Sequence, residues 1–349
     1  MILPGSYVAT LLILVLSMIC WGSWANTYKL CPPKWRFELF YFDFAIGVFI
    51  AAIIAALTFG SLGWDGFSFL DDLRLAGKRS DALAFLAGVI FNLANMLLVG
   101  AIAIAGMAVA FPVGIGIALI EGVVLNYFLN PVGNPAFLFT GAGVIMLAIV
   151  FDSLAYRSYA MAASVAAAQQ GKTRTTKRKT GAKGIVISII SGLLMGVFYP
   201  FVEMARAGET GLGPYSIAFI FALGVLLSTF VFNLFFLNLP LQGKPIDIFD
   251  YFKARVKTHM LGIVGGMIWL AGAVSNFVAA RAEGQAQVGP AVSYAIGQGA
   301  TMISALWGVF VWKEFARADG RVRAFIAVMF FLFVAGLALV SSAPLFGNR

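Results

Sequence analysis

The chain is poor in charge, cysteine and histidine, and each shortage excludes a class of function. Charged residues make up 11% of its 349 residues, about half the share of an ordinary soluble domain. The two cysteines, Cys20 and Cys31, offer no disulfide framework, and a single histidine, His259, cannot build a histidine-based metal cluster. No nucleophile–base constellation or cofactor motif is present, so we expect no enzyme activity, no metal and no cofactor.

Apolar residues, in contrast, make up 61% of the chain. Apolar runs of about 20 residues mark membrane-spanning helices, and such runs cover the chain without leaving room for a soluble domain. The first run begins almost at Met1 with no basic residue before it, so we interpret it as a retained span rather than a signal peptide. The predicted spans are 6–27, 38–60, 82–103, 106–128, 136–155, 184–204, 213–238, 258–280, 286–311 and 323–343.

The distribution of basic residues predicts the orientation. Of the 24 Lys and Arg residues, most lie in the loops that follow odd-numbered spans, and such loops face the cytoplasm. We therefore expect a multi-pass protein of the cell (inner or plasma) membrane with both termini outside the cytoplasm. The net charge of +9 serves this orientation and does not indicate nucleic-acid binding.

A repeated framework predicts two halves. One constant offset in residue number relates three helix-shaping positions of the first half to the second, which suggests duplication. Repeats that meet near the bilayer midplane are typical of secondary transporters. We predict a first five-helix repeat over 1–157, a basic cytoplasmic linker over 158–183 and a second repeat over 184–349. The related positions are Gly88, Gly106 and Pro112 with Gly266, Gly284 and Pro290.

Within the predicted linker, the string from Ala166 to Thr173 (AAAQQGKT) resembles a phosphate loop with alanine in place of the first glycine. A working phosphate loop follows a strand, opens a helix and has a magnesium-binding partner. None of this context is present, so we predict a linker that does not bind nucleotide.

Polar groups in the first half are candidates for a solute path. Asn92 and Asn95, three residues apart, share a helical face. Buried amides in a membrane helix either join helices or face a cavity, and the sequence leaves both open. Trp21, near the end of the first span, is either an interfacial anchor or a stacking wall for a ligand.

Two aspartates are expected to serve structure rather than transport. Asp43 enters the second span near the membrane surface, where we expect it to pair with Arg36 or Lys34. Asp152 ends the fifth span, and we expect a surface ion pair between Asp152 and Arg157.

Glu121 lies about 15 residues into the fourth span. An ionised carboxylate at such depth costs on the order of 3 kcal/mol, so it must be neutral, paired or facing water. Glu121 is either a helix–helix hydrogen-bonding residue or an acid that carries a proton or binds a ligand. We propose it as the proton-coupling acid.

The second half carries a polar stripe. Tyr294, Gln298 and Thr301 stand at i, i+4 and i+7 of a predicted continuous helix. Such a stripe faces protein or water rather than lipid, and we assign it to a substrate path that also includes Asn92 and Asn95.

Three further residues complete the candidate substrate site. Trp269 and Asn276 fall on one face of the eighth span by the helical period. Tyr199 in the sixth span falls on Trp21 at the offset of the repeated framework, so both are either equivalent cavity walls or equivalent interfacial anchors.

Three strings resemble a known family: FYFDFAIGVFIAAIIAALTFGSLG, NLANMLLVGAIAIAGMAVAFPVGIGIALIEGVVLNYFLN and GIVISIISGLLMGVFYPFVE. They look like the ureide permease and bacterial sugar-uptake branches of the drug/metabolite transporter superfamily. The resemblance implies an all-α integral membrane fold, with ten transmembrane helices as two inverted five-helix repeats around a central cavity. It also implies proton-coupled uptake of ureides such as allantoin, nucleobases or sugars by alternating access.

The predicted function is therefore secondary active uptake of a small neutral polar solute, with that solute, the lipid bilayer and protons as partners. The amide and aromatic groups named above favour it. The alternative is an exporter of amphipathic drugs or metabolites, which the same superfamily contains and which binding of apolar cations would support.

Overall fold

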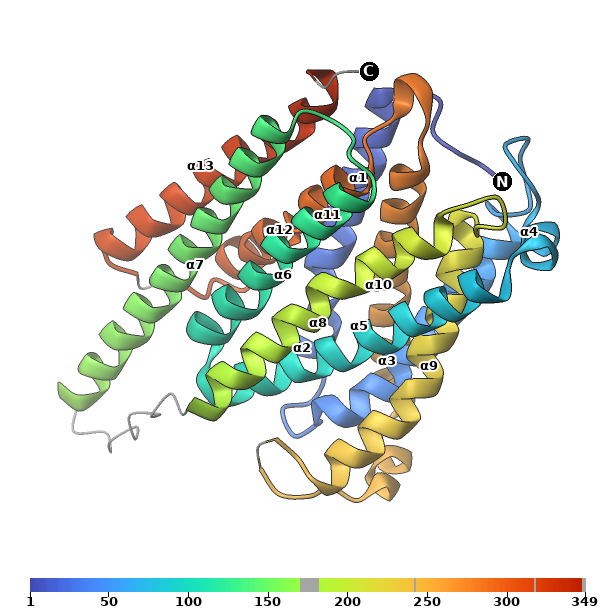
Figure 1. The fold of residues 1–349 in the computed structure, drawn as a ribbon. Helices are drawn as coiled ribbons and strands as arrows, with labels where there is room; N and C mark the ends of the chain where they lie inside the picture. The colour runs from blue at the N-terminus through green and yellow to red at the C-terminus, as the bar shows by residue number, and fades with distance from the viewer. Residues whose placement is uncertain (170–181, 242, 317, 347–349) are drawn as a thin grey trace.

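The computed structural model describes residues 1–169, 182–241, 243–316 and 318–346. Within these ranges the chain forms helices and no strand, and ten segments are long and apolar enough to cross a membrane (Figure 1). The expected all-α integral membrane class is confirmed. The helices are α1 (Tyr7–Ser23), α2 (Ala25–Lys29), α3 (Phe37–Leu57), α4 (Phe69–Leu75), α5 (Lys78–Ala105), α6 (Met107–Leu129), α7 (Pro135–Gln169), α8 (Ala182–Arg206), α9 (Pro214–Asn238), α10 (Val256–Arg281), α11 (Pro290–Gly297), α12 (Ala300–Leu306) and α13 (Gly320–Ser342), with short turns η1 (Ile248–Lys253), η2 (Gly284–Ala286), η3 (Trp307–Val311) and η4 (Ala343–Leu345).

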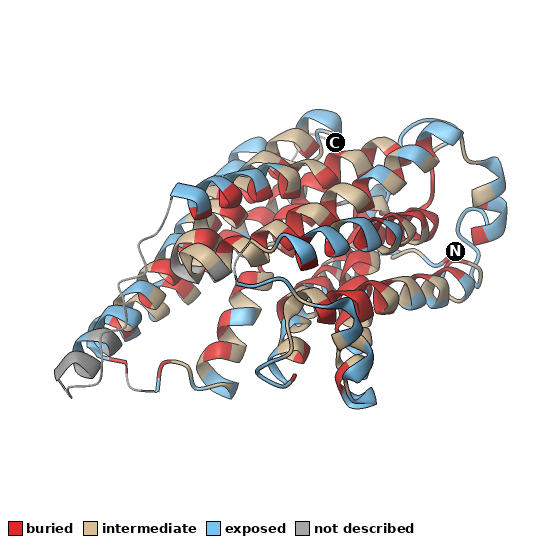
Figure 2. Cartoon of the chain, turned by 90° about the horizontal axis from the view of Figure 1, so that it is seen from below, coloured by how far each residue is buried: buried red, intermediate tan, exposed pale blue. Residues whose placement is uncertain are grey.

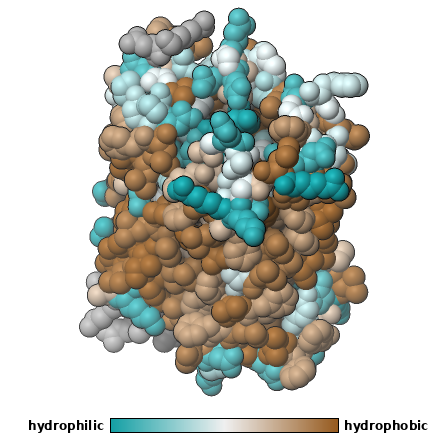
Figure 3. All heavy atoms as spheres, turned by 45° about the vertical axis from the view of Figure 1, so that its right-hand side comes forward, coloured by the Kyte–Doolittle hydropathy of each residue, from teal (hydrophilic) through white to brown (hydrophobic). Residues whose placement is uncertain are grey.

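Two ends of the bundle can be told apart. Both termini lie at one end (Figure 1), which we call the termini end, together with the loops 58–77 and 207–213. The loops 30–36 and 239–255 lie at the other end, which we call the linker end. Buried residues follow the inner faces of the helices (Figure 2). On the face that Figure 3 shows, hydrophobic residues form a broad surface, and hydrophilic residues gather above it and reach its middle. The hydrocarbon core of a lipid bilayer requires such an apolar surface.

Helix α7 is longer than the sequence predicts. It continues to Gln169, so the first part of the predicted linker 158–183 is helical. The phosphate-loop-like string Ala166 to Thr173 begins in this helix, and its residues after Gln169 lie outside the described residues. The division of the chain into two repeats and a linker stays a prediction.

The ninth span is broken near its middle. Helix α11 ends at Gly297, α12 begins at Ala300, and a π-helical turn, η3, completes the span. At the break the backbone N–H of Gly299 bonds the carbonyl of Ile296 at 2.9 Å, a tighter 3₁₀ pattern. Glycine is a poor helix former, and two glycines flank Gln298 here. The predicted span over 286–311 is therefore confirmed, but its α-helical hydrogen bonding is interrupted at Gln298 and Gly299.

Two helix crossings bring backbones into direct contact through glycine. In the α3/α10 crossing, a Cβ added to Gly266 would lie 2.0 Å from the carbonyl oxygen of Phe44, and one added to Gly47 would lie 2.0 Å from that of Ile263. No side chain fits at such distances, so glycine allows these helices to pack closely.

The α5/α9 crossing repeats this arrangement. A Cβ added to Gly88 would lie 2.1 Å from the carbonyl oxygen of Phe221, and one added to Gly224 would lie 2.3 Å from that of Phe85. Each crossing packs the third span of one half on the second span of the other, which fits an inverted repeat. The contact residues also correspond in sequence: Phe85 and Gly88 precede Ile263 and Gly266 by one constant offset, and Phe44 and Gly47 precede Phe221 and Gly224 by an offset shorter by a single position.

Candidate functional site

An aromatic stack lies in the core around Trp269 of α10. Its indole packs on Phe91, with ring centroids 4.3 Å apart, and on Phe221 at 5.9 Å. Trp21 of α1 also stacks on it at 6.0 Å, and its Nε1 donates to the backbone carbonyl of Trp269 at 3.2 Å. Trp21 is half-buried here, and its role as a stacking wall stays a prediction.

A polar cluster adjoins this stack. The hydroxyl of Tyr199 donates to Oδ1 of Asn276 at 2.6 Å, and Nδ2 of Asn276 donates to the backbone carbonyl of Ser293 at 3.0 Å. The Tyr294 ring lies 5.2 Å from that of Tyr199, and its hydroxyl lies 3.1 Å from backbone carbonyls of both α6 and α8. Nδ2 of Asn276 also donates to Oγ of Ser17 on α1 at 3.4 Å. Five spans thus meet at these side chains, and the structure brings Tyr199, Asn276 and Tyr294 together.

Glu121 lies beside this polar cluster. Its carboxylate faces Gly196 of α8, where an added Cβ would lie 2.7 Å from Oε2. The neighbouring Gly122 packs against the Tyr294 ring. Oε2 is buried without a hydrogen-bond partner, and no hydrogen bond of this carboxyl group is found in the described part of the chain. The helix–helix hydrogen bond, one of the two alternatives for Glu121, is therefore not observed.

The two amides of α5 have different partners. Nδ2 of Asn92 donates to Ser228 at 2.7 Å and to Thr229 at 3.0 Å, both on α9. Nδ2 of Asn95 instead donates to the Tyr41 hydroxyl on α3 at 3.1 Å. Asn92 therefore joins α5 to α9, whereas Asn95 joins α5 to α3.

The remaining stripe residues stand apart from this cluster. Gln298 is half-buried at the break between α11 and α12, and Thr301 is buried one turn later. In the ranges that the structure describes, no side-chain hydrogen bond joins either residue to Tyr294 or Asn276. The helix break therefore separates the predicted stripe into two parts.

Asp43 corrects a prediction and reveals a group that sequence reasoning missed. Its carboxylate is 2% exposed and does not pair with Arg36 or Lys34. Oδ1 accepts from the Tyr251 hydroxyl at 2.5 Å, and Oδ2 lies 2.8 Å from Nδ1 of His259. Both partners lie in the other half of the chain, so only the lone histidine and the aspartate inside an apolar run could have signalled the site.

The prediction of a surface ion pair between Asp152 and Arg157 is also wrong. Asp152 is buried, at 7% exposure, while Arg157 on the following turn is exposed. The ion pairs within the described ranges include none between them. Arg36, the expected partner of Asp43, instead donates two hydrogen bonds to Glu38, from Nη2 at 2.6 Å and from Nε at 3.2 Å.

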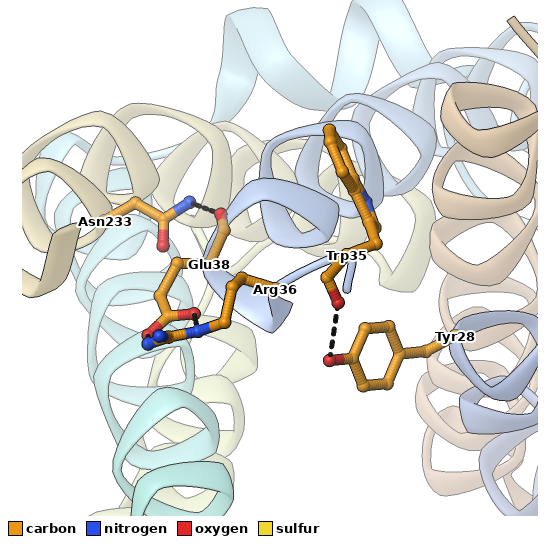
Figure 4. A network of polar contacts seen from close by, with 5 residues as sticks. All are labelled: Tyr28, Trp35, Arg36, Glu38 and Asn233. Atoms are coloured by element: carbon orange, nitrogen blue, oxygen red, sulfur yellow. Dashed lines mark hydrogen bonds and ion pairs between the residues drawn. The ribbon is translucent and has the colours of Figure 1, made fainter. Parts of the chain in front are cut away.

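Cavities open at both ends of the bundle, and the packed core lies between them. The termini-end cavity, of about 900 Å³, includes Glu203, one turn beyond Tyr199. The linker-end cavity, of about 510 Å³, includes Met96, next to Asn95. Arg36 and Glu38 also line the second cavity, and Figure 4 shows their pairing next to Tyr28. A closed core between two cavities is what a solute path with alternating access needs.

Comparison with known proteins identifies the family. The ureide permease family model matches residues 40–183 and 171–343. The chain belongs to the ureide permease family. The family resemblance predicted from sequence is confirmed, and permease relatives indicate a multi-pass transporter rather than an enzyme.

Individual relatives match over nearly their whole length. Ureide permease 2 of Arabidopsis thaliana is 24% identical, with 99% of this chain and 98% of the relative covered. Ureide permease 1 of the same plant is 22% identical over 96% of each chain, and probable ureide permease A3 of Vigna unguiculata is 21% identical. A protein of known crystal structure shares the fold, with a TM-score of 0.59, 18% identity and 96% of each chain covered.

Proposed function

We propose that this protein takes up a small neutral polar solute, a ureide such as allantoin, a nucleobase or a sugar, by proton-coupled alternating access. The observation that carries the proposal is the aromatic and amide-rich core closed between two cavities. The family membership supports a ureide as the first candidate.

The chemistry of the core suits such a solute. The ring and the ureido group of allantoin are each nearly planar and carry N–H donors and C=O acceptors, so either can stack on an indole and exchange hydrogen bonds with amides. Trp21 and Trp269 offer the stacking surfaces, and Asn95, Asn276 and Gln298 offer the amides. In the closed core Tyr199 occupies Oδ1 of Asn276, so a solute would take the place of this bond.

The break in the ninth span supplies a hinge. Discontinuous helices are common at transporter binding sites, because the break frees backbone groups and lets the halves of the helix move separately. Gln298 and Gly299 stand at this break, and Thr301 begins the next helical turns. Gln298 and Thr301 would therefore meet the solute as the core opens.

Glu121 is proposed as the coupling acid. Its buried Oε2 has no partner, so the carboxyl group is better accommodated neutral than charged at this depth. It adjoins Tyr294 across Gly122, which places a proton-carrying group beside the proposed solute site.

The positive-inside bias supports an orientation in the cell membrane with the linker end in the cytoplasm and both termini outside. The termini-end cavity would then receive the solute. Alkaline phosphatase fused to the last residue, Arg349, should be active, whereas fluorescence of a green fluorescent protein fused there would contradict this orientation.

The test is an uptake panel in proteoliposomes with radiolabelled allantoin, uracil and glucose. We expect one of these to accumulate when the outside is acidic. Gln298→Leu should weaken its apparent affinity about tenfold, because one lost polar contact at a site that hydrogen-bonds its ligand costs about 1.4 kcal/mol or more. Asn238→Leu, at the exposed end of α9, is the matched control and should change nothing. Extrusion of an amphipathic cation without uptake of any panel solute would favour the exporter.

Glu121→Gln keeps the shape of the side chain but cannot ionise. It should abolish accumulation driven by a pH gradient and reduce solute exchange without a gradient far less. Accumulation equal to that of the parent would remove Glu121 from the coupling mechanism.

A further inference from the structure

Three segments meet at a buried carboxylate near the linker end. Asp43 belongs to α3, Tyr251 to η1 and His259 to the first turn of α10, and we call them the Asp43 cluster. Both carboxylate oxygens are engaged, one by the Tyr251 hydroxyl and the other by Nδ1 of His259. The Asp43 side chain is 2% exposed and that of His259 is 19% exposed, so water can reach the imidazole but not the carboxylate.

The other titratable groups that face this cluster hold their protons. Burial, followed by the hydrogen bond to Asp43, raises the pKa of Tyr251. Burial also raises the pKa of the Cys31 thiol to about 11, and the Asp43 carboxylate adds to this rise. Neither group loses a proton near neutral pH, so the contact between Asp43 and His259 is the part of the cluster that is left to bind one.

The charged groups nearby are compensated or exposed. Arg36 and Glu38, just before Asp43 on the same segment, form an ion pair. Arg255 and Lys257, beside His259 in sequence, are exposed to solvent, where water screens their charges. A proton that binds here therefore responds mainly to the Asp43 carboxylate.

One residue links this cluster to the linker-end cavity. The Trp35 ring packs edge-on against the imidazole of His259, with centroids 5.9 Å apart. Its backbone carbonyl accepts from the Tyr28 hydroxyl at 3.1 Å, and Tyr28 lines the cavity (Figure 4). The cluster therefore adjoins the space through which solute would leave towards the linker end.

We propose that Asp43 and His259 form a second proton-binding site of the transport cycle, at the linker end of the bundle, in which the Tyr251 hydroxyl holds the carboxylate by a hydrogen bond. Beside an ionised Asp43, Nδ1 of the neutral imidazole carries a hydrogen and donates it to the carboxylate. A proton from water then binds Nε2, the net charge of the pair changes from −1 to 0, and release to water reverses the step. The role in transport rests on the proposed proton-coupled uptake, whereas proton binding itself does not.

Because His259 is the only histidine, one spectrum tests the proton-binding step directly. Histidine labelled with ¹⁵N in protein purified without a polyhistidine tag and placed in nanodiscs gives one imidazole. If the imidazole binds a proton, its nitrogen signals should change from the neutral to the charged form as the pH is lowered. Asp43→Asn should alter that titration, whereas Asp250→Asn, in an exposed ion pair of the same loop, should not. A signal that stays in one form throughout, or ignores Asp43→Asn, would overturn the proposal.

Transport measurements separate this site from the proposed function. With one proton per solute, a gradient of one pH unit supports about tenfold accumulation. The His259→Gln variant should let the panel solute reach the same concentration inside and outside the vesicles, without accumulation. If His259→Gln accumulates solute like the parent, the second site is wrong while uptake stands. If the parent takes up no solute, but the histidine signal changes with pH and Asp43→Asn alters that change, the proposed function fails and the proton site remains.

Discussion

The α3/α10 and α5/α9 crossings share one backbone geometry but differ in their polar contents. In both, glycines let the carbonyls of one helix approach the other helix closely. At α5/α9 the buried polar group is the Asn92 amide, bonded to two hydroxyls. At α3/α10 it is the Asp43 carboxylate, bonded to a phenol and an imidazole. The first network holds no ionisable side chain, whereas the second holds a carboxylate and an imidazole.

The difference follows from individual substitutions at related positions. At the offsets that relate the glycines of the two crossings, Asp43 corresponds to Ile220 of α9, and His259 corresponds to Asp81 of α5. The acid–imidazole pair therefore has no counterpart at the α5/α9 crossing. A scaffold that requires small residues twice has acquired an ionisable pair only once, which agrees with a chemical rather than a packing role for the Asp43 cluster.

The largest expected effect tests the shared geometry. Gly266→Ala and Gly88→Ala each place a Cβ about 2 Å from a backbone oxygen, and such overpacking costs about 1–3 kcal/mol or more. Both variants should lower the thermal midpoint of the purified protein by similar amounts. Gly143→Ala, where an added Cβ meets nothing within 4 Å, is the control. A loss at only one crossing would break the comparison.

Asn92→Ala tests the neutral network. It removes the bonds that join α5 to α9 and should cost about 1–2 kcal/mol of stability. Because no group of this network titrates, the loss should be equal at acid and neutral pH. Thermal unfolding at both pH values measures it, and a loss confined to one of them would mean that this crossing also carries a titrating group.

Tyr251→Phe sharpens the account of the ionisable network. It deletes only the hydroxyl that donates a hydrogen bond to Asp43. The loss of stability should be about 0.5–1 kcal/mol, because Tyr251 is half-buried. The pH dependence of uptake should change as well, since the carboxylate loses a bond that stabilises its charged form. An unchanged pH profile would leave Tyr251 as a packing residue.

The smallest effect is expected within the same turn. Lys253 is exposed and forms an ion pair with Asp250, and such surface pairs contribute little. Lys253→Ala should change neither the thermal midpoint nor the pH profile of uptake. A change as large as that of Tyr251→Phe would show that any alteration of η1 disturbs the cluster.

Much of this molecule could be predicted from its sequence, because lipid imposes long apolar helices whose composition is local information. The ten spans and the family resemblance are confirmed, and Tyr199, Asn276 and Tyr294 do meet. Helical spacing tells which residues share a face, but it does not tell which helix covers that face. Asn92 and Asn95 therefore have separate partners, and the two partners of Asp43, both in the other half of the chain, were not foreseen. The break at Gln298 depends on a local change from α-helical to 3₁₀ hydrogen bonding, which the pattern of apolar residues does not predict.

One measurement tests proton-coupled uptake and the role of the Asp43 cluster together. Proteoliposomes loaded with a pH-sensitive dye, and starting without a pH gradient, receive the panel solute on the outside. Solute entry should acidify the interior in the parent protein. In His259→Gln, solute should enter without acidification, while Asn238→Leu behaves like the parent. Solute entry without acidification in the parent, or equal acidification in His259→Gln, would contradict the account.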